Sequence, residues 1–232
     1  MPLPRALLAG SPVIPAGGLA PTTAATAPAG GAAAVAPGKG GSPFTMQTQT
    51  QDKWCWAAVA TSISLHYPAP GRCRPRCPTS WAAVATSISL HYDSSSGWTQ
   101  CQLANNILSR PSGVDCCVSG SDTECDVEWY LDKALTATSN LLDVRAGAVD
   151  FSILTALMNG DRPLAARVEW IGGGGHFVVF HRWEKTASGT EFVNVADPYY
   201  GKRIVPYNDC VHRYPATGTT TGTWTHSYWT QP

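Results

Sequence analysis

The spacing of apolar residues predicts helices in the first part of the chain and strands in the second. In four stretches, apolar side chains recur every three or four positions, which is typical of helices with one buried face. These stretches span residues 56–67, 99–109, 126–136 and 150–157. Runs rich in Val, Phe and Trp predict strands at 164–170, 176–184 and 191–196, an edge strand at 203–207 and a C-terminal strand at 224–229. Helices followed by antiparallel strands indicate an α+β fold.

Polar and small residues mark the expected ends of several elements. Asp126 and Asp150 each precede an apolar stretch and are candidate N-caps, because a carboxylate accepts hydrogen bonds from the first backbone N–H groups of a helix. Gly160 should end the fourth helix, and Gly189 should turn the second strand into the third. These signals bound the elements that the periodicity predicts.

One segment occurs twice in the chain. WAAVATSISLHY stands at 56–67 and again at 81–92, offset by 25 residues. Identity at every position indicates a recent tandem duplication or a sequence error rather than a solenoid repeat. Only one copy can occupy the central helix of a single core. We expect the first copy there, because it follows Cys55 while the second follows Ser80, so residues 68–92 should bulge from the fold and lower its stability.

Composition divides the chain into a leader and one domain. Residues 1–43 are rich in Ala, Gly and Pro and should be disordered. Arg5 before an apolar run suggests an export leader, although Pro12 and Pro15 interrupt that run. A mis-assigned start site is the alternative. Residues 44–232 are long enough for one domain.

Charge argues against two classes of partner. Lys plus Arg and Asp plus Glu both number 16, so the net charge is zero and no basic field attracts nucleic acid or a membrane surface. Charged residues make up 14% of the chain, against about a quarter in an average domain, which favours an extracellular protein. No apolar run approaches the length needed to span a membrane.

The chain has eight cysteines, four of them close together. We expect two disulfides within this cluster, in keeping with a secreted protein, rather than buried free thiols. Zinc is less favoured, because no histidine lies at zinc-finger spacing nearby. The pairing is not determined by sequence, and Cys210 can remain unpaired. The cysteines are Cys55, Cys73, Cys77, Cys101, Cys116, Cys117, Cys125 and Cys210.

Three separated motifs carry candidate chemistry. Cys55 lies between two tryptophans at the expected start of a helix, where the helix dipole favours a thiolate. His176 follows four glycines and opens a strand, and Asp197 precedes Pro198 at the end of the next strand. A cysteine, a histidine and an aspartate can act as nucleophile, base and orienting group. Each could instead be structural, as a core thiol, a core histidine or a turn initiator, but together they favour catalysis. We interpret the other histidines as structural or surface residues.

These motifs resemble those of papain-like cysteine peptidases, in particular a bacterial secreted branch related to avirulence proteases and bacteriocin-processing peptidases. The resemblance covers residues 44–232 apart from the duplicated stretch, and rests on QTQDKWCWAA, GGGGHFVVF and VADPYYG in that order. It implies a helical N-terminal part whose central helix carries the cysteine and packs on a C-terminal antiparallel sheet. The active site would be the cleft between them.

The resemblance also implies a role for each site residue. Cys55 would attack a peptide carbonyl and form a thioester, His176 would transfer the proton, and Asp197 would orient the imidazole. A glutamine side chain upstream would bind the oxyanion, with Gln49 the first choice and Gln51 the second. No cofactor or metal is implied. We expect a monomer that acts on a protein or peptide substrate.

The sequence leaves two other functions open. The same triad could catalyse a different acyl transfer, as in a deamidase or transamidase toxin, because nucleophile and base are shared. Alternatively, the chain could be a non-catalytic, disulfide-held secreted domain that the duplication inactivated. The reactivity of the Cys55 thiol distinguishes an enzyme from this last possibility.

Overall fold

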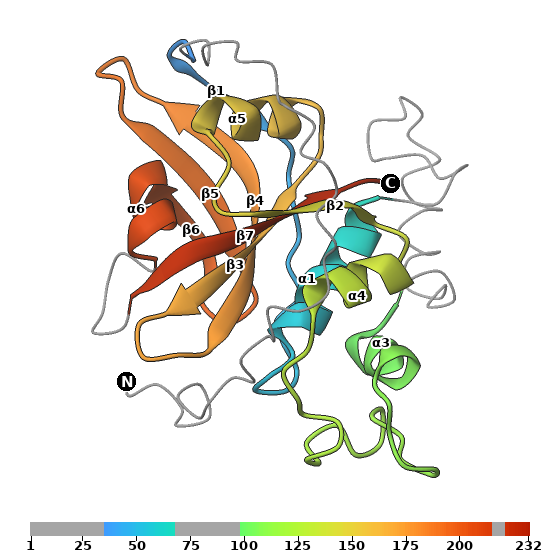
Figure 1. Ribbon diagram of the computed structural model, residues 1–232. Helices are drawn as coiled ribbons and strands as arrows, with labels where there is room; N and C mark the ends of the chain where they lie inside the picture. Colours follow the sequence, from blue (N-terminus) through green and yellow to red (C-terminus); the bar gives the residue numbers. More distant parts are fainter. Residues whose placement is uncertain (1–34, 68–97, 215–220) are drawn as a thin grey trace, which may run out of the picture.

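The computed structural model describes residues 35–67, 98–214 and 221–232 (Figure 1). Most of the expected leader, the second repeat copy and the inserted stretch with Cys73, Cys77 and His91 lie outside the described residues. The elements are β1 (Gly38–Gly41), α1 (Cys55–His66), α3 (Gln100–Ile107), α4 (Leu131–Ala137), β2 (Leu141–Ala146), α5 (Phe151–Asn159), β3 (Leu164–Trp170), β4 (Gly175–Lys185), β5 (Glu191–Asp197), β6 (Gly201–Pro206), α6 (Tyr207–His212) and β7 (Gly222–Thr230). No helix in the described ranges is long and apolar enough to cross a membrane.

A seven-stranded antiparallel sheet forms the centre of the molecule. Its strand order is β2-β7-β3-β4-β5-β6, and β1 pairs with the C-terminal half of β4. The edge position of β6 agrees with the sequence expectation, whereas the C-terminal strand β7 is inserted between β2 and β3. The α+β class predicted from the sequence is confirmed.

Helices cover both faces of this sheet (Figure 1). On one face, α1 packs with α3 and α4 over inward-pointing side chains such as Ala165, Phe177 and Val179. On the other face, α5 and α6 cover alternate residues of the same strands, including Ala166 and Val178. This alternation follows from the two-residue period of a strand. Because both faces are covered, the central strands are apolar along most of their length.

The first repeat copy forms α1, the central helix of the group made by α1, α3 and α4. Side chains from Trp56 to Ala60 have no exposed surface, so α1 is buried on all sides along its first turns. The hydroxyls of Thr61 and Ser62 are buried as well, and donate to the carbonyls of Ala57 and Ala58 at 2.8 and 2.6 Å. Their polarity is thus satisfied within the helix.

Several element ends differ from the sequence expectation. Thr99 forms a capping box with Gln102 at the start of α3. Asp150 occupies the N-cap position of α5, as predicted, but its side chain makes no cap hydrogen bond. The expectation that Asp126 caps α4 is wrong, because α4 begins at Leu131. The Asp126 carboxylate accepts a hydrogen bond from the Lys53 backbone N–H instead, at 2.9 Å. The Asp126 carboxylate is thus bound by a backbone N–H far away in the chain, and not by the first N–H groups of α4.

Three short elements escaped the sequence analysis. The strand β1 contains three glycines in a stretch that composition assigned to the linker, and it pairs with β4 through its backbone. The strand β2 is only partly buried, and α6 is a helix of 6 residues. None of them has enough apolar periodicity to be recognised without its partners.

Candidate active site

The three candidate triad residues lie at the ends of elements that meet. Cys55 is the first residue of α1, and α1 packs against β4. His176 lies at the start of β4 and Asp197 at the end of β5. Because β4 and β5 are antiparallel neighbours, with Val179 opposite Ala196, the start of one strand adjoins the end of the other. Side chains separated by more than a hundred residues in the chain thereby share one site.

The imidazole of His176 connects the carboxylate and the thiol. Its Nε2–H donates to Asp197 Oδ1 at 2.9 Å, and the two side chains are 4% and 0% exposed. The side chain of Cys55 lies close enough to this ring to help raise the pKa of the imidazole. Since Nε2 is occupied by the carboxylate, Nδ1 is the nitrogen left for the sulfur. The ring is thus oriented for proton exchange with Cys55.

The charges in this group stabilise one another. Burial alone opposes protonation of His176, but the charge and hydrogen bond of Asp197, assisted by Cys55, raise the pKa of the imidazole to about 10. Burial likewise opposes ionisation of Asp197, yet the nearby imidazolium and the hydrogen bonds it receives lower its pKa. An imidazolium beside a sulfur favours the thiolate form of that sulfur.

Asp197 is held by three further donors. The backbone N–H groups of Tyr199 and Tyr200 donate to Oδ1 at 2.8 Å each. The hydroxyl of Tyr214 donates to Oδ2 at 2.6 Å, and this tyrosine is fully buried. The sequence analysis missed Tyr214, because a single tyrosine after a short helix has no distinguishing pattern. The turn that begins at Asp197-Pro198 thus also supplies backbone N–H groups that hold the Asp197 carboxylate.

Two aromatic rings surround the imidazole. Trp170, the last residue of β3, stacks on His176 with ring centroids 5.9 Å apart and an interplanar angle of 19°. Tyr200 contacts the ring by its edge, at 6.2 Å. The chain from Gly172 to Gly174 has positive φ at each glycine, which lets the hairpin between β3 and β4 turn back tightly. The glycine run therefore has a structural role in placing Trp170 over the imidazole.

The glutamines upstream of Cys55 point in different directions. The backbone N–H of Gln49 donates to the carbonyl of Pro198 at 3.1 Å, next to Asp197, so Gln49 lies beside the triad. Its side-chain Nε2 donates to the carbonyls of Gln51 and Asp52 at 3.0 and 2.7 Å. The side chain of Gln51 lies against Gly120 instead. The structure thus gives Gln49 the closer relation to the triad.

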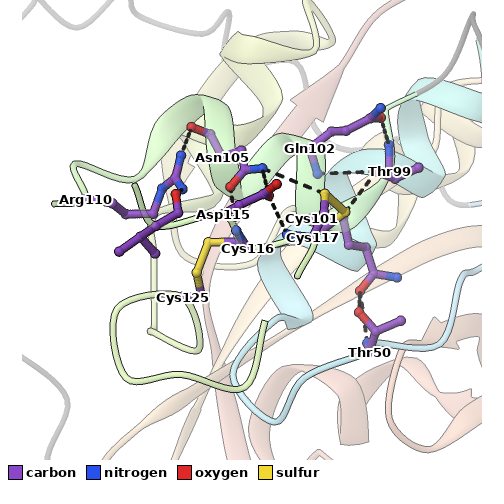
Figure 2. The surroundings of a disulfide bond; sticks show 12 residues. Thr50, Thr99, Cys101, Gln102, Asn105, Arg110, Asp115, Cys116, Cys117 and Cys125 are labelled. Carbon is purple, nitrogen blue, oxygen red and sulfur yellow. Dashed lines mark hydrogen bonds between the residues drawn. A yellow bond between two sulfur atoms is a disulfide. The ribbon is translucent and has the colours of Figure 1, made fainter. Parts of the chain in front are cut away.

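The cysteine cluster forms two disulfides, as predicted. They join Cys101 to Cys117 and Cys116 to Cys125, and they hold the loop between α3 and α4 (Figure 2). Cys55 and Cys210 are the free cysteines of the described residues, and both are buried. In the described ranges, no group of three or more His, Cys, Asp or Glu side chains gathers as metal ligands would.

Most of the remaining histidines have structural partners. His66 pairs with Asp161 at 3.2 Å, and His181 donates from Nδ1 to the Ser42 carbonyl at 3.0 Å. His226 is partly buried in β7, and His212 is exposed at the end of α6.

A comparison with protein-family models finds no match, and a comparison with curated proteins finds none either. Any functional conclusion therefore depends on the geometry of the site.

Proposed function

We propose that the protein is a secreted, papain-like cysteine peptidase that cleaves peptide bonds through Cys55, His176 and Asp197. The observation that carries the proposal is the double engagement of His176, whose Nε2 binds Asp197 at 2.9 Å while the ring also contacts Cys55. A buried imidazole of this kind can take a proton from the thiol and return it to a leaving amine. The position of Cys55 as first residue of α1 adds the favourable field of the helix N-terminus.

The reaction would proceed in two acyl transfers. The Cys55 thiol gives its proton to Nδ1 of His176, and the thiolate attacks the carbonyl carbon of the substrate. When the tetrahedral intermediate collapses, the C–N bond breaks, the amine leaves with the imidazole proton, and a thioester remains on Cys55. A water molecule, deprotonated by His176, then attacks the thioester and releases the carboxylic acid.

The developing oxyanion needs hydrogen-bond donors. The backbone N–H at Cys55 is one candidate, because the first N–H groups of a helix have no acceptor within that helix. The side-chain amide of Gln49 is the other. Both hydrogens of this amide now point to backbone carbonyls, at 3.0 and 2.7 Å, so one of them must turn toward the substrate oxygen.

Secretion is supported by the disulfides. Two disulfides hold the loop between α3 and α4, and disulfides persist mainly in oxidising compartments. The low content of charged residues, 14%, is in keeping with an extracellular protein.

Digestion of gelatin or casein tests the proposal directly. The full chain should cleave these proteins, the Cys55→Ala variant should not, and the Cys210→Ala variant should retain the activity because Cys210 lies in α6, within the opposite core. Cleavage by Cys55→Ala would overturn the proposal. Ammonia release from glutamine-containing peptides without cleavage, lost in Cys55→Ala, would assign the triad to deamidation instead.

A further inference from the structure

The segment that carries Cys55 is tied on both sides to one tripeptide of a distant loop. Before the cysteine, the Lys53 backbone N–H donates to Asp126 Oδ1 at 2.9 Å, and the Trp54 indole N–H donates to the Cys125 carbonyl at 2.8 Å. After it, the Trp56 indole N–H donates to the Val127 carbonyl at 3.0 Å. The tripeptide 125–127 thus holds the residues on either side of the nucleophile.

These contacts matter because α1 begins without a side-chain cap. Trp54 occupies the N-cap position and makes no side-chain cap hydrogen bond. The first turn of the helix, which includes Cys55, is therefore positioned by contacts from outside the helix. The two tryptophans beside the cysteine are buried, so their indole N–H groups require acceptors, and residues 125–127 supply both of them.

A disulfide holds the tripeptide in place. Residues 125–127 belong to no helix or strand. Cys125 is bonded to Cys116, whose backbone N–H donates to the side chain of Asn105 on α3 at 2.8 Å. Figure 2 shows this disulfide beside the second one, which joins Cys117 to Cys101 on α3. The tripeptide is thus connected to α3 through covalent bonds and a side-chain network.

We propose that Asp126 and the Cys116–Cys125 disulfide are positioning elements for Cys55, so that reactivity of the free thiol requires the neighbouring pair of cysteines to stay oxidised. The inference rests on the proposed function and adds a condition to it. A dithiol reductant would break the S–S bond by donating two electrons and two protons, forming two thiols on the protein and a cyclic disulfide of the reductant. Residues 125–127 would then lose their covalent connection to Cys116.

The two disulfides differ in burial, so they should differ in how easily a reductant opens them. Cys116 and Cys125 are 2% and 0% exposed, whereas Cys117 is exposed and Cys101 is partly exposed. A thiolate must reach a sulfur to open a disulfide, so the Cys101–Cys117 bond should open first. A mild reductant can therefore keep Cys55 reduced while the Cys116–Cys125 bond remains intact.

The Asp126 contact can be tested with a pair of matched variants. Asp126→Asn keeps an oxygen acceptor for the Lys53 N–H and removes the charge, whereas Asp126→Ala removes the acceptor. The pKa of Asp126 is raised by burial, even though the hydrogen bond from Lys53 opposes the shift, so a neutral group is tolerated there. We expect Asp126→Ala to lower both the kcat for peptide hydrolysis and the alkylation rate of Cys55 by about tenfold, with KM unchanged. Asp126→Asn should stay within about twofold of the parent rate. Equal rates for the alanine variant and the parent would overturn the role of Asp126.

The disulfide is tested by two double variants. Cys116→Ser with Cys125→Ser should lower the alkylation rate of Cys55, measured under native conditions, while Cys101→Ser with Cys117→Ser should leave it within about twofold. Circular dichroism verifies that both variants fold. If the first does not fold, the parent protein is titrated with dithiothreitol. The Cys55 alkylation rate should then fall together with opening of the Cys116–Cys125 bond, monitored by peptide mapping, and not with opening of Cys101–Cys117. Unchanged Cys55 reactivity after the buried bond opens would overturn the proposal.

Alkylation by iodoacetamide separates this proposal from the peptidase assignment, because it needs no substrate. A parent Cys55 that reacts slowly at mildly acidic pH would contradict the proposed catalytic function. A parent Cys55 that reacts quickly, together with equally quick variants, would contradict the positioning proposal alone.

Discussion

Two free cysteines of this protein occupy helices in opposite cores, and they differ in their neighbours. Cys55 begins α1 and lies beside His176, which in turn binds Asp197. Cys210 lies within α6, where burial and then the charge of Asp209 raise the pKa of its thiol. Both side chains are nearly inaccessible, with relative exposures of 9% and 0%. Burial therefore does not distinguish them, and the adjacent imidazole does.

This contrast predicts that one chain contains a reactive and an inert thiol. A buried thiol without a cationic neighbour stays protonated, because desolvation disfavours the anion. Next to an imidazolium, the negative charge is compensated at short range. The following predictions test how much of the difference comes from each neighbour of Cys55.

The largest expected effect is the difference in alkylation between the two thiols. At pH 5.5, an ordinary thiol is ionised in roughly one molecule per thousand, whereas an imidazolium–thiolate pair is mostly ionised. Because burial raises the pKa of the Cys210 thiol above that of an ordinary thiol, iodoacetamide should label Cys55 at least about a thousandfold faster than Cys210 in the native protein. Peptide mapping by mass spectrometry measures both rates in one sample.

Two controls sharpen this comparison. His176→Ala should slow the labelling of Cys55 at pH 5.5 toward that of Cys210, because the compensating charge is lost. In urea, Cys55 and Cys210 should be labelled at equal rates, since unfolding removes the environment of each thiol. If Cys55 in His176→Ala reacts as quickly as in the parent, the imidazole does not activate it.

A smaller effect is expected from the oxyanion donor. Replacing Gln49 by Ala should lower kcat about a hundredfold while leaving alkylation of Cys55 within about twofold, because an alkylation reaction forms no oxyanion. Gln51→Ala is the matched control, since the side chain of Gln51 lies against Gly120. A larger loss in Gln51→Ala than in Gln49→Ala would reverse the assignment of the two residues.

The hydroxyl of Tyr214 should have an effect of about tenfold on kcat, the usual size for loss of a hydrogen bond to a charged group. Tyr214→Phe leaves Asp197 Oδ2 without the donor at 2.6 Å, which raises the pKa of this carboxyl and loosens its hold on the imidazole. The acidic limb of the pH–rate profile should therefore shift to higher pH. Tyr207→Phe is the control, because the hydroxyl of Tyr207 donates to the Val149 carbonyl instead. Equal profiles for the two variants would exclude a role for Tyr214 in orienting the base.

The last prediction concerns stability rather than rate. The pKa of His176 is raised from 6.5 to about 10 by Asp197 and Cys55 against the opposing effect of burial, so its stabilising contribution is complete below pH 6.5 and is lost as the pH rises toward 10. Urea unfolding should show that the difference in unfolding free energy between the parent and His176→Gln shrinks over this range. His181 provides a contrast, because burial lowers its pKa. The contribution of His181 should instead be lost as the pH falls below 6.5, so slopes of the same sign for His176→Gln and His181→Gln would contradict these directions.

The helices and strands were predictable wherever the apolar pattern was long. The strand predicted at 164–170 has the same bounds as β3. β4 is one residue longer at each end than the strand predicted at 176–184, and β5 is one residue longer at its C-terminal end than the strand predicted at 191–196. These strands are buried on both faces, so their apolar runs are long and clear. Asp126 shows where local patterns fail, because the donor that satisfies it comes from Lys53, far away in the chain.

The candidate site was only partly visible in the sequence. Cys55, His176 and Asp197 were recognisable as candidates from their sequence motifs, and the structure brings them together. Tyr214 and Trp170 lie in no motif, and their roles depend on the strand order that places them against Asp197 and His176. Residues 125–127 are similar, since their importance follows from the disulfide that Cys125 forms.

The sequence by itself determined the α+β fold class and the presence of a disulfide cluster, and it named the candidate residues of the site. These follow from periodicity, motif chemistry and composition, which are local properties of the chain. Only the tertiary structure decided which cysteines pair, which upstream glutamine lies beside the triad, and which donors hold Asp197 and the residues flanking Cys55. Those choices depend on distances between segments far apart in sequence, and such distances are set by how the sheet and its covering helices pack.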